Sequence, residues 1–303
     1  MMREQEKAAQ LEHRRGAECP LCASSVTHPV WRKEAARIHR CPRCGVLYVV
    51  ERPAESEVAY LYDTGTLLGG QPHFSSSSDG PVPEWKRREH FELLDDLARL
   101  GVHGGRLLDV GCFGGTFLQH ARQRGFDVAG VDPSYDAFRY VCEVLGLPAA
   151  HGTLRGAGFP AASFSAVSLL DVIEHVPEPV DELQEVFRIL RPGGALVITT
   201  PDAAGLLQRI LKVKRRMLGR EWCPIDSVPW HLWGFTRESL RLCAEKAGFV
   251  VRKTLALVPS PRSTNDGAGS VRWKRSLLRI VADLSQAVDM SDRMAILAQR
   301  PAE

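Results

Sequence analysis

Residues 106–115 read Arg-Leu-Leu-Asp-Val-Gly-Cys-Phe-Gly-Gly, an apolar run that leads directly into glycines. The apolar run predicts a short buried strand over 106–110, and the pattern that follows predicts a helix over 116–124. Glycines between a strand and a helix let the backbone come close to a ligand and place that ligand at the helix N-terminus. This stretch therefore predicts a strand–turn–helix unit of the kind that binds nucleotides.

On both sides of that unit, strand and helix patterns alternate along the chain. We expect strands at 106–110, 127–131, 167–170, 195–200, 249–258 and 293–299, and helices at 84–100, 116–124, 135–145, 180–190, 237–247 and 273–287. Residues 191–194, Arg-Pro-Gly-Gly, predict a helix stop and a turn. Because strands that alternate with helices form a parallel, doubly wound sheet, the fold class expected is α/β.

The composition is that of a globular protein. The chain has 303 residues, of which 44% are hydrophobic and 25% charged, and its net charge is +3. That charge is too small to indicate nucleic-acid binding by itself. No apolar run approaches the roughly 18–20 residues that cross a bilayer, and the charged residues 1–15 lack the apolar segment of a secretory signal. We therefore expect a cytoplasmic protein without a transmembrane segment.

Four of the eight cysteines form two similar pairs, Cys19-Pro-Leu-Cys22 and Cys41-Pro-Arg-Cys44, with 18 residues between them. Zinc takes four thiolates in a tetrahedron, and two such pairs separated by roughly 15–20 residues are typical of a zinc ribbon. The alternative, a redox dithiol, needs one pair in a thioredoxin-like context, which this sequence lacks. Because protein ligands fill all four positions, we predict a structural zinc ion rather than a catalytic one.

These patterns divide the chain into four parts. We predict a polar tail over 1–16, a zinc ribbon over 17–50, a connector or lid over 51–83 and a main domain over 84–303. Glycine, serine and proline crowd the stretch 64–83, which is typical of a linker. Within the main domain, residues 203–232 interrupt the alternation of strands and helices, and we interpret them as an insertion.

A second carboxylate, Asp132, ends the next predicted strand 23 residues after Asp109, a distance that suits a grip on ribose hydroxyls. Taken singly, each aspartate could be a helix cap and each glycine a plain turn residue. The joint arrangement favours a nucleotide site. The dinucleotide pattern G-x-G-x-x-G fails, because position 113 is Phe.

Five motifs, in this order, resemble those of class I S-adenosylmethionine-dependent methyltransferases, and the third looks like the ubiquinone-biosynthesis O-methyltransferase branch. They are Leu-Leu-Asp-Val-Gly-Cys-Phe-Gly-Gly at 107–115, Gly-Val-Asp-Pro-Ser at 130–134, Leu-Leu-Asp-Val-Ile-Glu-His-Val-Pro at 169–177, Arg-Ile-Leu-Arg-Pro-Gly-Gly at 188–194 and Val-Ile-Thr-Thr-Pro-Asp at 197–202. The resemblance covers 84–299. It implies a Rossmann-like seven-stranded fold, to which the zinc ribbon is a small N-terminal addition, and S-adenosylmethionine as the cofactor.

The resemblance also implies roles for individual residues. Gly111 and Gly115 would line the methionine part of the cofactor, Asp109 would hold its ammonium group, and Asp132 would bind the ribose. The full set of implied cofactor-binding residues is Asp109, Gly111, Cys112, Phe113, Gly115, Asp132, Pro133, Thr153, Leu154 and Asp171. Within that set, Thr153 and Leu154 would contact the adenine, and Asp171 would lie beneath the methyl group. The sequence departs from the family pattern at Phe113, where the family has glycine, and at Ser165, where it usually has Asp.

Methyl transfer to an oxygen or an acidic carbon also needs a base. The candidates are His231 and His175, with Glu174 as a neighbour of the latter. Relatives use the inserted segment that holds His231 to cover the acceptor, so we favour His231. Glu174 and His175 could equally be a helix-start pair, and the aromatic neighbours of His231 could be simple packing. A divalent metal site built from all three is a further hypothesis, since some relatives bind an ion through a similar cluster.

Residues 209–220 carry six lysines and arginines and no acidic residue, and leucine and isoleucine recur among them at helical spacing. The segment could be a solvated helix, a binding surface for a phosphorylated or nucleotide-linked substrate, or a helix that lies on an anionic membrane.

Three functions compete. The first is a methyltransferase for a small molecule, such as a sugar, a lipid-linked glycan or a natural product. The second is a ribosomal RNA base methyltransferase, because the large-ribosomal-RNA guanine methyltransferases also carry an N-terminal zinc ribbon. Their second cysteine pair usually ends in His, however, whereas Cys44 completes it here, and the ribbon lacks a dense basic and aromatic face. The third is a non-catalytic binding protein with the same fold, against which the near-complete cofactor motifs argue. We expect the first.

Overall fold

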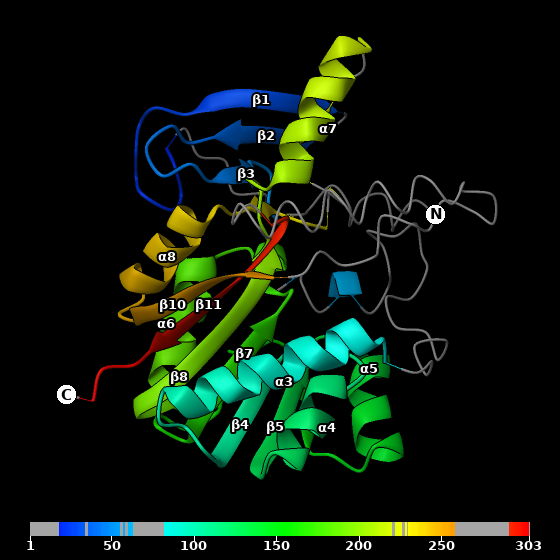
Figure 1. Cartoon of the computed structure of the whole chain (residues 1–303), viewed down its shortest axis with the longest axis vertical. Helices are drawn as coiled ribbons and strands as arrows, with labels where there is room; N and C mark the ends of the chain where they lie inside the picture. Colours follow the sequence, from blue (N-terminus) through cyan, green and yellow to red (C-terminus); the bar gives the residue numbers. More distant parts are fainter. Residues whose placement is uncertain are drawn as a thin grey trace.

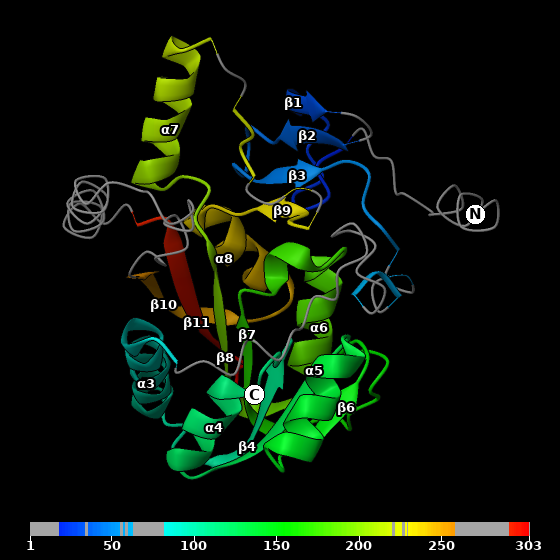
Figure 2. The same cartoon turned by 90° about the vertical axis from the view of Figure 1, so that its right-hand side faces the viewer.

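The structure is a computed structural model that describes residues 18–33, 36–54, 57, 60–62, 82–219, 222–225, 228, 230–257 and 291–302. A seven-stranded sheet lies at the centre, with helices on both of its faces (Figure 1). A second sheet of four strands lies beyond the carboxyl ends of the parallel strands (Figures 1 and 2).

The large sheet has the order β10-β11-β8-β7-β4-β5-β6. Its strands are β4 (Gly105–Val110), β5 (Phe126–Asp132), β6 (Ala149–His151), β7 (Phe164–Leu170), β8 (Leu190–Pro201), β10 (Val250–Leu257) and β11 (Arg293–Gln299). All neighbours pair in parallel except β11, which is antiparallel to both β8 and β10. The order reverses at β4, which lies between β5 and β7, and ligands of open α/β sheets bind at the carboxyl ends of the strands at such a point.

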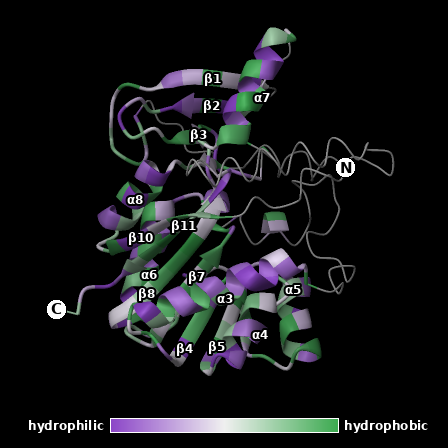
Figure 3. Ribbon diagram, viewed as in Figure 1, coloured by the Kyte–Doolittle hydropathy of each residue, from purple (hydrophilic) through white to green (hydrophobic). Residues whose placement is uncertain are grey.

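Successive residues of the buried strands point to opposite faces of the sheet, and each face has its own core. Leu107 belongs to the cluster formed with α3 (Glu84–Arg99) and α4 (Thr116–Gln123). Leu108 belongs to the cluster formed with α6 (Pro179–Ile189) and α8 (Arg237–Lys246). The inner strands β7 and β8 are coloured as mostly hydrophobic in Figure 3, as burial on both faces requires.

The small sheet joins the cysteine-rich segment to the main domain. Its order is β1 (His28–Lys33), β2 (Ala36–Arg40), β3 (Leu47–Val49) and β9 (Trp233–Gly234), with antiparallel pairing throughout. The strand β9 follows the insertion predicted at 203–232. A strand from late in the chain therefore completes the sheet that the cysteine-rich segment begins.

The predicted doubly wound α/β sheet is confirmed. The predicted strands and helices between residues 84 and 257 are present, although the last part of the helix predicted at 135–145 is a π-helical turn, η3 (Tyr140–Val144), that continues α5 (Tyr135–Arg139). The short strands β1, β2, β6 and β9 were not predicted, because two to six residues of mixed polarity carry little periodicity. The insertion contains a helix, α7 (Leu206–Met217), that projects from the rest of the molecule (Figure 2).

Residues 191–194 were predicted as a turn, but they belong to the start of β8. The backbone N–H of Gly193 donates to the carbonyl of Arg300, and the N–H of Arg300 donates to the carbonyl of Gly194. Pairing with the C-terminal end of the chain therefore extends the sheet into this segment. The tail 1–16, most of the connector 51–83 and the helix predicted at 273–287 lie outside the described residues.

Candidate functional site

Three aspartates lie at one edge of the large sheet. Asp109 is the last residue but one of β4, Asp132 ends β5, and Asp171 follows β7. Because these strands are parallel and adjacent, their carboxyl ends meet at the same edge, on both sides of the position where the strand order reverses. The sequence predicted all three as cofactor-binding residues, and the fold brings them to one place.

The turn after β4 is built from left-handed backbone. Gly111, Phe113 and Gly115 have φ angles of 68°, 44° and 66°. A Cβ atom on Gly111 would lie 2.6 Å from Val172, and one on Gly115 would lie 2.7 Å from Leu145. Both glycines are therefore required by packing as well as by backbone conformation. Phe113 departs from the family pattern, which has glycine at this position. It nevertheless adopts the left-handed conformation that glycine takes more easily, so the backbone still forms the turn.

The carboxylate of Asp132 is held by the backbone around it. It accepts hydrogen bonds from the N–H of Phe113 at 2.8 Å and from the N–H of Ser134 at 2.9 Å, and the side chain is buried. The next residue, Pro133, has its carbonyl oxygen 3.1 Å from Nε2 of His151. Asp132 thus ties the glycine turn after β4 to the end of β5.

The carboxylate of Asp109 lies deeper. It accepts a hydrogen bond of 2.7 Å from the hydroxyl of Ser168 on the neighbouring strand β7. Burial raises the pKa of Asp109 to about 7, because a low-dielectric environment disfavours the charged form. An adjacent cation would restore the ionised carboxylate, which is the behaviour expected of a group that meets an ammonium ion.

The other predicted cofactor residues lie around these two. Cys112 is buried, and its Sγ lies 2.6 Å from where a Cβ on Gly130 would be, so the side chain points into the core. Thr153 and Leu154 follow β6. The residue before them, Gly152, donates its N–H to the carbonyl of Asp132 at 2.9 Å. The proposed adenine contact is therefore linked through the backbone to the proposed ribose contact.

Asp171 is held by an arginine from the far end of the chain. Nη2 of Arg293 donates to both carboxylate oxygens of Asp171 at 3.0 and 2.9 Å, and Nη1 donates to Glu89 on α3 at 2.6 Å. Arg293 is 8% exposed, and its guanidinium joins Asp171 to Glu89 through two different nitrogens. The carboxylate beneath the proposed methyl position is thus paired with a buried arginine.

Glu174, His175 and His231 come together although the last is far away in the sequence. One ligand-type atom from each lies within 4.8 Å of the others, close enough to share a divalent ion. The rings of His175 and His231 meet edge to face with centroids 4.7 Å apart. Nδ1 of His175 lies 2.9 Å from the carbonyl oxygen of Trp230. Since a carbonyl only accepts, Nδ1 carries the proton, and in the neutral ring the lone pair is on Nε2.

The carboxyl group of Glu174 is buried beside these rings. It accepts a hydrogen bond of 2.9 Å from the hydroxyl of Thr200. Burial, with the charge of Asp171 as a second cause, raises the pKa of Glu174 to about 8. Near neutral pH the group is therefore mainly protonated, and it can donate a hydrogen bond to its neighbours.

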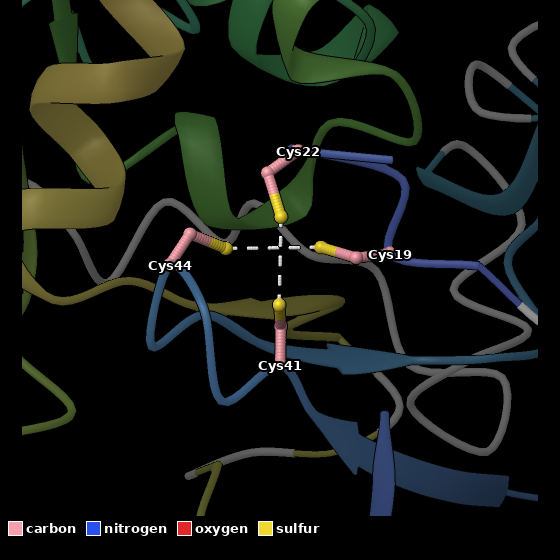
Figure 4. Close-up of side chains that lie close together, drawn as sticks. All are labelled: Cys19, Cys22, Cys41 and Cys44. Atoms are coloured by element: carbon pink, nitrogen blue, oxygen red, sulfur yellow. Dashed lines mark hydrogen bonds between the residues drawn. The ribbon is translucent and has the colours of Figure 1, made fainter. Parts of the chain in front are cut away.

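The four cysteines of the two pairs point at a common centre (Figure 4). Sγ of Cys19 lies 3.7 Å from that of Cys44, and Sγ of Cys22 lies 3.5 Å from that of Cys41. A tetrahedral zinc ion with Zn–S bonds of about 2.3 Å requires sulfur atoms about 3.8 Å apart. The donor set and its spacing fit zinc. The hydrogen bond between the two thiols lowers the pKa of Cys19 and raises the pKa of Cys44, as for two thiols that share one proton.

Each cysteine pair is closed by the same kind of turn. The N–H of Ala23 donates to the carbonyl of Cys19 at 2.8 Å, and the N–H of Gly45 donates to the carbonyl of Cys41 at 2.9 Å. Ala23 and Gly45, which follow the second cysteine of each pair, have φ angles of 55° and 76°. The residue after each pair is therefore left-handed, a conformation that suits Gly45 and that Ala23 repeats.

Four residues that hold this site together were not predicted from the sequence. They are Arg52, Ser168, Thr200 and Arg293. Each acts on a residue at least 26 positions away in the chain, so no local pattern points to it. One weak signal was present for Arg293, a cation at the start of an otherwise apolar predicted strand.

Comparison with known proteins agrees with this geometry. The family described as "Methyltransferase domain" matches residues 84–254, more than half of the chain. The ubiquinone biosynthesis O-methyltransferase of Psychrobacter cryohalolentis is 32% identical over 111 residues, which are 34% of this chain and 43% of that protein. The enzyme of the same name from Pseudomonas fluorescens is 30% identical over 132 residues, 38% of this chain and 56% of that protein. The chain spans about half the length of these curated relatives.

Among solved structures, the [4+2]-cyclase SpnF superimposes with a TM-score of 0.54 over 83% of this chain and 98% of that chain, at 20% identity. This likeness concerns the fold alone. Together with the match to residues 84–254 and the five ordered motifs, it confirms the resemblance noted in the sequence. The chain belongs to the methyltransferase-domain family, in the class I S-adenosylmethionine-dependent group.

Proposed function

We propose that this protein transfers a methyl group from S-adenosylmethionine to a small-molecule acceptor by in-line displacement. One observation carries the proposal. Asp109 and Asp132, which are predicted to bind the cofactor, lie at the same sheet edge as Asp171. Asp171 in turn lies close to the Glu174–His175–His231 cluster, since its charge contributes to the raised pKa of Glu174. A donor side and an acceptor side are therefore adjacent.

The residues on the donor side fit the chemistry of the cofactor. A carboxylate can accept more hydrogen bonds than the two that Asp132 takes from backbone N–H groups, which is what a ribose diol requires. The pKa of about 7 for Asp109 suits a group that becomes ionised when an ammonium ion lies beside it. When bound, S-adenosylmethionine supplies a methyl group on a sulfonium ion, and the chain's task is to position the acceptor in line with it.

On the acceptor side, we assign His231 as the base that takes the proton of the acceptor. His175 packs edge to face against it and is fixed by the carbonyl of Trp230, so the two rings hold a defined relative orientation. Glu174, mainly protonated, contributes a hydrogen-bond donor. A divalent ion shared by the three residues is the alternative, and it would orient an acceptor oxygen directly.

The four-cysteine cluster, we propose, binds one structural zinc ion. Sulfur spacings near those of a tetrahedral site support this, as do four protein ligands that would leave the ion no open position. Elemental analysis of the purified protein tests it. Cys44→Ser should lower the zinc content, whereas Cys243→Ser, a buried cysteine outside the cluster, should not.

The projecting helix α7 favours a lipid-linked acceptor. None of its residues is buried, and Val213 and Met217 are 58% and 82% exposed. Apolar and cationic residues alternate along it in Figure 3, without an acidic residue. An apolar face flanked by cations suits the surface of an anionic bilayer. Within the described residues, no helix is both long enough and apolar enough to span a membrane.

Vesicle binding tests this part of the proposal. Co-sedimentation with phosphatidylglycerol vesicles should exceed that with phosphatidylcholine vesicles, and Met217→Glu should weaken it. Val250→Glu, at another exposed apolar residue, serves as a control. Equal binding to both kinds of vesicle, or none, would remove the support for a lipid-linked acceptor and leave soluble sugars and natural products.

Calorimetry with S-adenosylhomocysteine tests the core of the proposal, with NAD as the control ligand. Binding of the former alone supports methyl transfer and justifies a screen of labelled acceptors. Binding without transfer to any small molecule, but with transfer to ribosomal RNA, would favour the second function considered above. No binding by folded protein would favour a non-catalytic role.

A further inference from the structure

The cysteine-rich module consists of residues 18–52, with the four cysteines, the strands β1 to β3 and Arg52. The segment that carries Glu174 and His175 is held from the side of this module. Three of its backbone carbonyls accept hydrogen bonds: that of Glu174 from the N–H of Leu232 at 2.8 Å, that of Val176 from the indole N–H of Trp233 at 2.8 Å, and that of Pro177 from Nε of Arg52 at 3.2 Å. Two of these donors belong to the strand β9 or the residue before it, and the third follows β3.

The strand β9 is in turn held by β3. Tyr48 pairs with Trp233, and the N–H of Val49 donates to the carbonyl of Leu232 at 2.8 Å. Leu232 therefore lies between two partners: its N–H reaches Glu174 and its carbonyl reaches the cysteine-rich module. Its preceding neighbour is His231. A shift of β3 would move both ends of the Glu174–His175–His231 cluster.

Arg52 links these pieces. It is 5% exposed, its Nη1 donates to the carbonyl of Val49 at 2.9 Å, and its guanidinium lies over the ring of Trp233 at 4.7 Å from the centroid. Nη2 lies 3.8 Å from the carboxylate of Glu178. One side chain thus contacts β3, β9 and the residues directly after His175, and a buried guanidinium with this many partners has little freedom to move.

The cysteine cluster lies in the same core. Cys19, Cys41 and Cys44 are buried in one continuous cluster with Tyr48 and Trp233. The N–H of Cys41 donates to the carbonyl of Val46, the residue that precedes β3. The second cysteine turn therefore sets where β3 begins.

We propose that the cysteine-rich module positions the acceptor side of the active site. Arg52 is the positioning residue, because it links the module to the backbone segments that hold His231 and His175. This rests on the proposed function in one respect only, the role assigned to the two histidines. The hydrogen-bond path from the cysteine turns to Leu232 and Glu174 does not depend on it.

The test uses the full metal-loaded chain with Arg52→Met, Arg52→Lys and Arg43→Met, the last changing an exposed arginine between the second pair of cysteines. We expect Arg52→Met to keep its zinc and its affinity for S-adenosylhomocysteine within about twofold. Hydrogen exchange of the Leu232 and Trp233 amides should quicken about tenfold or more, as for a segment that opens locally. The kcat should fall by about 10- to 100-fold, less than the roughly 100- to 10,000-fold that a positioned base supplies, and its dependence on pH should change. Arg52→Lys should recover part of this, and Arg43→Met should change nothing.

Unchanged amide exchange in Arg52→Met would overturn the proposal, and so would faster exchange with an unaltered kcat and pH profile. If that variant fails to fold, Trp233→Phe removes the hydrogen bond to Val176 and reduces the size of the buried ring, while it keeps an aromatic ring beside Arg52, and the same two outcomes apply. Removal of zinc should also quicken exchange at Leu232. Should no acceptor be methylated by the wild-type chain, the proposed function fails, whereas the exchange data still decide whether the module orders the segment.

Discussion

Asp132→Asn replaces one oxygen atom of the proposed ribose contact with an amide nitrogen and removes its charge. In the structure the two carboxylate oxygens accept the N–H groups of Phe113 and Ser134. An amide keeps one acceptor oxygen, while its NH₂ group must face the other N–H, donor against donor. The variant should therefore weaken both the cofactor site and the turn that shapes it.

The magnitude follows from the number of hydrogen bonds lost. A hydrogen bond to a charged group contributes about 1.5–3 kcal/mol, so the loss of one within the protein should lower the free energy of unfolding by about 2–3 kcal/mol. On the ligand side, the loss of one charged hydrogen bond to a ribose hydroxyl should weaken the binding of S-adenosylhomocysteine by about 10- to 100-fold. Asp132→Ala leaves both N–H groups without this partner, so it tests the site less cleanly.

Isothermal calorimetry and chemical denaturation measure the two effects on the same samples. Asp127→Asn is the matched control, because it makes the same change on the same strand at an exposed residue whose ion pair with Arg106 lies at the surface. It should alter neither quantity appreciably. If Asp132→Asn is folded and binds S-adenosylhomocysteine within about twofold of the wild type, the assignment of Asp132 to the ribose is wrong.

Three further predictions concern the neighbouring residues. The binding of S-adenosylhomocysteine should strengthen close to tenfold between about pH 6 and pH 7.5. The reason is that burial raises the pKa of Asp109 to about 7, and the ionised carboxylate is the form that holds an ammonium ion. An identical pH dependence in Asp109→Asn would contradict this. Without ligand, the raised pKa makes folded Asp109 bind a proton more tightly than the unfolded residue does. The contribution of Asp109 to the free energy of unfolding should therefore fall as pH rises from about 4 to 7, by at most about 1.4 kcal/mol per pH unit, as the difference between denaturation curves of the wild type and Asp109→Asn can show. Phe113→Gly should change the free energy of unfolding by no more than about 1 kcal/mol, because it relieves a left-handed residue, whereas Gly115→Ala should lower it by about 1–3 kcal/mol through its clash with Leu145, as thermal melts can show.

Local features of the sequence predicted most of the central architecture. The alternation of apolar strand and amphipathic helix patterns placed β4, α4, β5, β7 and α6, because these elements are long enough to show their periodicity. The spacing of the two cysteine pairs predicted a cluster that the structure brings together. The glycine turn was predicted from residues that are adjacent in the chain.

The acceptor side could be predicted only in part. The sequence named Glu174, His175 and His231 as candidates but did not show that they meet, since their contact depends on how the insertion returns to the sheet. The catalytic roles of these three residues stay predictions, and so do the roles of the cofactor-binding residues and the division of the chain into domains. The cytoplasmic location likewise stays a prediction.

Residues that are neighbours in the chain were enough to predict the α/β class, the turn after β4 and the two cysteine pairs. The partners of the buried charges depend instead on how the whole chain packs. Arg293 lies 122 positions from Asp171, and Arg52 lies 125 positions from the Pro177 carbonyl that it holds. Periodicity and spacing describe short-range order, whereas a buried charge takes whatever partner the packed sheet brings within reach, and the order of the strands sets that choice.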